Sequence, residues 1–104
     1  MKPLYSLRNG FYNLVIWLSV IWRDRPWDYH YLFIMLHKKL SLMERFIRVK
    51  GCHEDHIMDA DRIKECIVLL DRIIADDYED MAMIVIDIRD LFKIMYNHVL
   101  EWWD

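Results

Sequence analysis

The sequence predicts an all-α protein, in which a short N-terminal helix precedes an antiparallel three-helix bundle. Of its 104 residues, 56% are hydrophobic and 30% are charged, a combination typical of helices with one apolar and one polar face. Only two glycines and two prolines are present, which leaves few turns and favours long helices over many short strands. The length fits one domain, spanning residues 1–104.

The N-terminal segment should begin irregularly and then form a short helix. Pro3 and the Asn9-Gly10 pair act as breakers, and a helix is expected over about residues 11–22. This helix is apolar on nearly every side, so the core or an oligomer interface must cover it, with Trp17 as an interface candidate. The apolar run is shorter than the roughly 20 residues of a membrane span. Its thin polar face also disfavours an interfacial membrane helix.

The second helix is expected over about residues 26–49. Asp24 and Pro26 are typical of a helix start, and Gly51 of a helix end. Its apolar stripe comprises Leu32, Leu36, Leu40, Met43 and Ile47. His30, His37 and Glu44 recur every seven residues on another side, about 10 Å apart along the axis, too far for two of them to share a metal ion. We interpret them as a solvated or interhelical polar seam.

Two further helices are expected over about residues 56–77 and 80–103, separated by the acidic run 76–80. The first has the inner stripe Ile57, Ala60, Ile63, Ile67, Leu70 and Ile74. The second has Ile84, Ile88, Leu91, Met95 and Trp102. Because the connections are short, sequential helices should lie antiparallel to each other.

Charge is distributed unevenly along the chain. Residues 1–50 hold nine basic and three acidic residues, a net charge of +6, whereas residues 51–104 hold five and fourteen, a net charge of −9. Basic and acidic helices that pack together would explain this, and so would a basic surface that binds an anion. An acidic protein without a dedicated basic stripe is not expected to bind extended nucleic acid.

Metal and catalytic motifs are weak. The cluster Cys52, His53, Glu54, Asp55 and His56 offers ligands but no second pair nearby, so we interpret it as a polar loop. The acidic set Glu65, Asp76, Asp77, Glu79 and Asp80 resembles carboxylates that hold Mg²⁺ in helical nucleotide hydrolases, but the second helix adds only Glu44. We therefore expect no metal, no cofactor and no catalytic residues, and a reduced state for Cys52 and Cys66.

The start of the second helix is the strongest ligand-binding candidate. Arginine forks bind phosphates, aromatic faces stack on bases, and helix N-termini attract anions. The candidate residues are Arg23, Arg25, Trp27, Asp28, His30 and Tyr31. In the alternative interpretation, Trp22 and Trp27 are core anchors, and the arginines pair with Asp24, Asp28 or the acidic run.

The two adjacent tryptophans near the last residues predict an oligomer contact. Trp102 and Trp103 cannot both face inward from one helix, so at least one should be exposed or meet another chain. Tryptophan is favoured at the centres of interfaces. We therefore expect a homo-oligomer.

The segments IWRDRPWDYHYLF, LLDRIIADDY and LFKIMYNHVLEWWD together resemble a family of small all-helical proteins of tailed bacteriophages. Where the family pattern is close to W-x-D-R-D-W-D, this chain has Pro26. The resemblance implies a phage origin and work in the cytoplasm of the host bacterium. It supplies no catalytic residues.

Three functions follow as hypotheses. The first is a non-enzymatic oligomeric binding protein that sequesters a small anionic nucleotide, such as a signal of host defence. The second is an inhibitor or adaptor that binds a host or phage protein through its helix faces. The third is a divalent-metal-dependent nucleotide hydrolase, which we expect less because the carboxylate pattern is incomplete.

Overall fold

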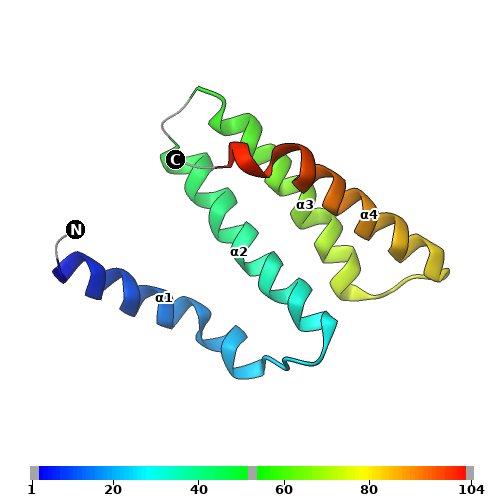
Figure 1. Ribbon diagram of the computed structural model, residues 1–104, viewed down its shortest axis with the longest axis horizontal. Helices are drawn as coiled ribbons and strands as arrows, with labels where there is room; N and C mark the ends of the chain where they lie inside the picture. The colour runs from blue at the N-terminus through cyan, green and yellow to red at the C-terminus, as the bar shows by residue number, and fades with distance from the viewer. Residues whose placement is uncertain (1–2, 52–53, 103–104) are drawn as a thin grey trace.

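The computed structural model describes residues 3–51 and 54–102, and within these residues it is all-helical (Figure 1). The helices are α1 (Pro3–Arg23), α2 (Tyr29–Lys50), α3 (His56–Ala75) and α4 (Met81–His98), followed by the 3-10 turn η1 (Val99–Glu101). No β-strand occurs in this part of the chain. The all-α prediction is confirmed.

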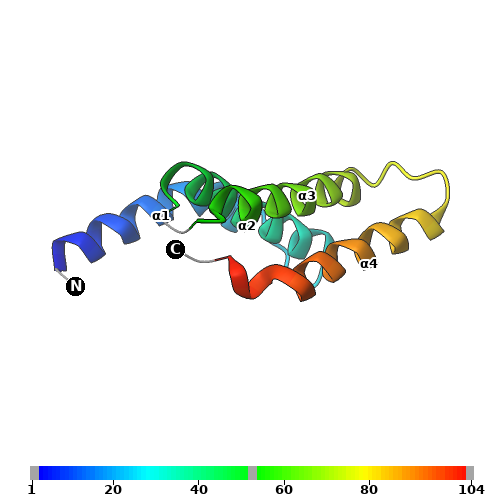
Figure 2. The same cartoon turned by 90° about the horizontal axis from the view of Figure 1, so that it is seen from above.

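Three of the helices pack closely, and the fourth stands apart. Figure 1 shows α2 and α3 side by side, while α1 and α2 diverge from their connecting turn like the arms of a V. Figure 2 shows α4 against one side of the α2–α3 pair, with the N-terminal half of α1 projecting beyond the rest of the molecule. The molecule is correspondingly flat, with extents of 51 × 36 × 18 Å.

The core lies where α2, α3 and α4 meet. α3 contributes most of it, including Ile63, Cys66 and Leu70, which are fully buried, and α4 contributes Leu91. The complete set of buried apolar residues is Phe33, Leu40, Ile47, Ala60, Ile63, Cys66, Ile67, Leu69, Leu70, Ile73, Ile84, Leu91 and Trp102. The stripes expected from 3.6-residue periodicity supply most of this core. Two of their members, Leu32 and Ile57, were expected inside but are 62% and 45% exposed.

α1 is longer than expected, because the helix begins at Pro3 instead of residue 11. Proline suits the first turn of a helix, since its missing N–H would have no intrahelical partner there. Gly10 lies within the helix and does not break it. A glycine inside a helix costs only about 1 kcal/mol relative to alanine, which neighbouring residues can offset.

α2 begins at Tyr29 instead of residue 26, and Asp28 is its N-cap in place of Asp24. The backbone of Asp28 is extended (φ −115°, ψ 115°), and its Oδ1 accepts a hydrogen bond of 3.0 Å from the N–H of His30. Pro26 and Trp27 lie in the preceding turn, which the Asp28 N–H closes onto the Arg25 carbonyl at 3.1 Å. Residues 26–28, which were expected inside the helix, therefore form the turn and the N-cap that precede it.

The later boundaries also differ by a few residues. α3 ends at Ala75 because Asp76 adopts the left-handed conformation (φ 52°), with its N–H bonded to the Arg72 carbonyl. α4 begins after Asp80, whose carboxylate accepts from the N–H of Ala82 at 3.0 Å. α4 ends at His98, and the chain continues through η1 to the buried Trp102.

Gly51 ends α2 for a packing reason. Its φ of −62° is open to any residue, but a Cβ there would collide with the Ile47 carbonyl oxygen and lie 2.6 Å from the Cβ of His56. The His56 Nδ1 also lies 2.9 Å from the Ile47 carbonyl oxygen. Gly51 therefore allows the start of α3 to approach the last turn of α2.

None of the described helices combines the length and the apolar character that crossing a bilayer requires.

Candidate functional site

The predicted ligand-binding residues lie in and around the turn between α1 and α2. This turn spans residues 24–28 and is held by two backbone hydrogen bonds, from Asp24 to the Ile21 carbonyl at 3.2 Å and from Asp28 to the Arg25 carbonyl at 3.1 Å. Only these five residues separate Arg23, the last residue of α1, from Tyr29, the first residue of α2. This turn lies at one corner of the molecule, where α1 and α2 meet (Figure 1).

Arg23 and Arg25 are exposed, and within residues 3–51 and 54–102 neither forms an ion pair. The expected alternative, pairing with Asp24, Asp28 or the acidic run 76–80, is therefore wrong for the described chain. Asp24 and Asp28 balance the formal charge of the two arginines at this turn, but no carboxylate of the described chain pairs with either guanidinium group. Their donors are available to an anion.

Trp22 and Trp27 flank these arginines and are 85% and 80% exposed. The interpretation of these two tryptophans as core anchors is therefore wrong. Because both tryptophans remain largely in water, their ring faces are accessible. A base or a partner side chain can stack on them.

The remaining predicted site residues have structural roles. Asp28 is half-buried and caps α2, so its carboxylate is occupied by the His30 N–H. The guanidinium carbon of Arg25 lies 5.8 Å from the centre of the Tyr31 ring, and the Tyr31 ring packs edge-on to His30 at a centroid distance of 5.6 Å. These contacts hold Arg25 at the turn, leaving Arg23, Arg25 and Trp27 as the residues that face solvent.

A groove lies between the arms of the V formed by α1 and α2. It has a volume of about 640 Å³, and Trp17 and Ile16 line it from α1, facing Phe46 and Met43 of α2. Lys39, Arg45 and Lys50 add positive charge to its α2 side. Trp17 is half-buried at this groove.

The predicted interface tryptophans differ in their placement. Trp102 also borders the groove, but it is only 6% exposed and packs into the core of its own chain. Its indole Nε1 has no hydrogen-bond partner in the described residues. Trp103 lies outside the described residues. The structure therefore leaves Trp17 at a partly open position and assigns Trp102 to the core.

The polar seam of α2 faces α3. His37 Nε2 lies 2.6 Å from Asp71 Oδ1 of α3. Glu44 accepts from Arg48 Nε at 2.9 Å, and Arg48 also reaches Asp61 of α3 at 3.0 Å. Hydrogen bonding to Glu44, and then to Asp61, raises the pKa of Arg48. Of the predicted seam, His37 contacts α3 directly and Glu44 does so through Arg48, whereas His30 packs against Tyr31 of α2.

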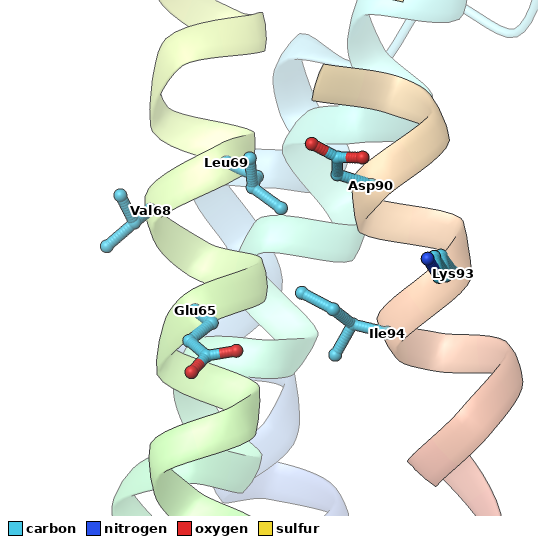
Figure 3. Close-up of a pocket in the computed structure, with 6 residues that line it drawn as sticks. All are labelled: Glu65, Val68, Leu69, Asp90, Lys93 and Ile94. Carbon is cyan, nitrogen blue, oxygen red and sulfur yellow. The ribbon is translucent and has the colours of Figure 1, made fainter. Parts of the chain in front are cut away.

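The carboxylates proposed for metal hydrolysis are not brought together. Glu65 lies in a hollow of about 470 Å³ between α3 and α4, opposite Asp90 and Lys93, with Leu69 and Ile94 pointing into the space between the helices (Figure 3). Asp76 follows Glu65 by eleven residues, about 16 Å along a helix axis. The acidic run 76–80 therefore cannot share a metal ion with Glu65.

Among the residues that the structure describes, no group of three or more His, Cys, Asp or Glu side chains is arranged to hold a metal ion. Cys52 and His53, from the predicted polar loop, lie outside the described residues. His56, the last residue of that cluster, contacts the Ile47 carbonyl oxygen.

A buried charge network was not predicted from the sequence. Asp87 of α4 is 7% exposed and accepts two hydrogen bonds from Arg72 of α3, at 3.1 and 3.0 Å, and a third from the Tyr78 hydroxyl at 2.5 Å. The Arg72 hydrogen bonds lower the pKa of Asp87, the Tyr78 hydroxyl acts in the same direction, and burial opposes both. Burial and the bond to Asp87 raise the pKa of Tyr78 to about 12.

Asp87 could have been found in the sequence. Ile84, Asp87, Ile88 and Leu91 have helical spacing, so a carboxylate at position 87 falls on the apolar stripe of α4. A buried carboxylate requires a cationic or hydrogen-bonding partner. The identity of the partner, Arg72, depends on how α3 and α4 are rotated against each other. The sequence alone does not indicate this rotation.

Cys66 is fully buried in α3 and carries a free thiol. Burial raises its pKa to about 11, so the thiol is protonated at neutral pH. Since the thiolate is the nucleophile and the metal ligand, Cys66 acts as a small apolar core residue.

No protein-family model, curated protein or solved structure matches this chain.

Proposed function

We propose that this protein is a non-enzymatic binding protein that sequesters a small anionic nucleotide at the α1–α2 turn. One observation carries the proposal: Arg23 and Arg25 have no ion-pair partner in the described chain and lie between Trp22 and Trp27, both at least 80% exposed. Guanidinium groups recognise phosphate, and tryptophan rings stack on bases, so this turn offers the two contacts that a nucleotide requires.

The proposal includes an oligomer of antiparallel helical bundles that works in the cytoplasm of a phage-infected bacterium. The resemblance to tailed-phage proteins motivates the cellular setting, and sequestration of a host defence signal is a function that requires binding alone. An open turn on one chain binds a nucleotide weakly, because pockets that bind small molecules bury most of the ligand surface. A neighbouring copy would supply the missing cover.

Calorimetric titration with a panel of cyclic and ADP-ribose nucleotides tests this proposal. We expect saturable binding of at least one nucleotide and release of the same, chemically unchanged nucleotide when the protein is denatured. Arg23→Ala and Arg25→Ala should each weaken binding by about tenfold or more, because a charge-assisted hydrogen bond contributes about 1.5–3 kcal/mol. Trp27→Ala should weaken it by a similar factor through lost stacking.

Arg89→Ala is the matched control, since Arg89 is an exposed arginine on α4, far along the chain from the turn. This variant changes the net charge equally and should leave affinity unchanged. Equal losses of nucleotide affinity for Arg89→Ala and Arg23→Ala would mean that overall charge, and not the turn, controls binding. No response to any nucleotide in the panel would contradict the proposal, and metal-dependent conversion of the nucleotide would favour a hydrolase instead.

A second candidate function is inhibition or adaptation of a host or phage protein through α4. The outer face of α4 and η1 favours it, because Val85, Phe92, Tyr96 and Leu100 are 64%, 50%, 87% and 91% exposed. Solvent-facing apolar side chains grouped on one element are typical of a protein interface. A nucleotide-free complex that Tyr96→Glu abolishes and Arg23→Ala preserves would distinguish this function from the first.

A further inference from the structure

α1 carries an apolar stripe that no part of the described chain, residues 3–51 and 54–102, covers. Leu7, Phe11, Leu14, Leu18 and Ile21 follow one another at intervals of four, three, four and three residues. This is the spacing of the a and d positions of a coiled coil, which places all five side chains on one face of the helix. Each of the five is between 55% and 71% exposed.

The stripe points away from the rest of the molecule. Ile16 and Val20, on the opposite side of α1, are half-buried, and Ile16 lines the groove facing α2. Trp17, at the edge between the two faces, is also half-buried and lines the same groove. One face of α1 therefore lines the groove with α2, and the face that carries the stripe remains exposed to solvent. Five large apolar side chains left in water on one helix are unfavourable, and a partner that covered them would stabilise the assembly.

The chain as a whole exposes more surface than a compact monomer of its size, which leaves enough area for a standard interface. The chain exposes 8176 Å², whereas a compact monomer of 12.9 kDa exposes about 6300 Å². Its radius of gyration is 15.6 Å, against about 13 Å for a compact domain of this length. The excess of about 1900 Å² exceeds the roughly 800 Å² that each partner buries in a standard interface.

The composition of α1 identifies the partner. The segment 3–23 contains no acidic residue, and its only charged residues, Arg8 and Arg23, lie outside the five stripe positions. Two such stripes can therefore meet without burying a charge. Charged residues beside a coiled-coil seam set which chains pair, and of the flanking positions within residues 3–23 only Arg8 is charged, so no charge pattern selects against a second copy.

We infer that the α1 stripe of Leu7, Phe11, Leu14, Leu18 and Ile21 pairs with the same stripe of a second copy of this chain. The inference makes the oligomer of the proposed function specific, and it does not depend on nucleotide binding. A chain that pairs through α1 without binding any nucleotide would contradict only the proposed function. A monomeric chain that binds a nucleotide would contradict only this inference.

Sedimentation of three purified chains tests the pairing. The wild type should be a dimer or a larger assembly, and Leu14→Glu/Leu18→Glu should be a monomer. The matched control is Val85→Glu/Phe92→Glu, which adds the same charge at similarly exposed positions of α4 and should remain associated. Circular dichroism checks that helix content is retained in all three, since leucine and glutamate have similar helix propensities.

Hydrogen exchange of the wild type provides a readout that needs no variant. Amides of residues 11–21 should exchange more slowly as protein concentration rises, and those of α3 should not change. A monomeric wild type, an associated Leu14→Glu/Leu18→Glu variant, or dissociation by the α4 variant alone would overturn the inference. So would α1 amides that are protected only when lipid vesicles are added, because the stripe would then face a membrane surface.

Discussion

Leu91→Ala should lower the free energy of unfolding by about 3–5 kcal/mol, the largest effect expected from a single core truncation in this chain. Leu91 has no exposed surface and lies on α4 in the cluster with Leu40 and Leu70. Truncation removes the transfer free energy of three carbon atoms and leaves a cavity that the α2–α3 pair cannot fill without moving. For a domain whose total stability is about 5–15 kcal/mol, this loss brings the folded state close to its limit.

Phe92→Ala is the matched control, because Phe92 is the next residue of α4 and is 50% exposed. Phe92→Ala should lower the free energy of unfolding much less than Leu91→Ala, although it removes more atoms. Urea unfolding of both variants at one fixed protein concentration measures the difference, since association would otherwise shift the midpoint. Equal losses would show that the core does not lie where α4 meets α2 and α3.

Asp87→Ala should cost about 2–3 kcal/mol, the second largest effect. The substitution leaves the Tyr78 hydroxyl and the Arg72 guanidinium without the acceptor that both now share. Losing one partner of a buried ion pair typically costs 3–5 kcal/mol, but the Arg72 side chain is 55% exposed and water replaces part of its loss. Thermal unfolding of Asp87→Ala, compared with Asp90→Ala as a half-buried carboxylate control, measures the difference.

The same network gives stability a defined dependence on pH. The pKa of Asp87 is lower in the folded chain than the usual value of about 3.9, so its contribution is complete above that pH and is lost as the pH falls through the lowered pKa. The pKa of Tyr78 is raised to about 12, so the contribution of its hydroxyl is complete below about pH 10 and is lost as the pH rises towards 12. Asp87→Ala should flatten the acid limb, and Tyr78→Phe the alkaline limb. An unchanged acid limb in Asp87→Ala would mean that other carboxylates control acid unfolding.

The helices were predictable because the periodicity of apolar residues can be recognised without knowing which helices pack together. Leu40 and Ile47 of α2, and Ile63, Ile67 and Leu70 of α3, were expected on inner stripes and are buried. The boundaries were less predictable. Asp24 and Asp28 have the same cap-forming side chain, and only the turn at Pro26 and Trp27 decides which of them caps α2.

The residue types of the candidate site could be predicted from the sequence, but the solvent exposure of these residues could not. Arg23, Arg25 and Trp27 were identified from residue type, but whether tryptophan lies in a core or in water depends on where α1 points. For the same reason Trp102 was expected at an interface and lies in the core: the chain leaves α4 at His98, and η1 returns it towards α2.

The exposed stripe on α1 has a consequence for the lifetime of the protein in a cell. A copy without a partner displays a helix that joins the body through residues 24–28 and keeps its apolar side chains in water. Quality-control chaperones and proteases act on chains that expose such segments. If α1 is covered only by pairing, unpaired copies would be removed preferentially, and the amount of protein that persists would depend steeply on how fast it is made.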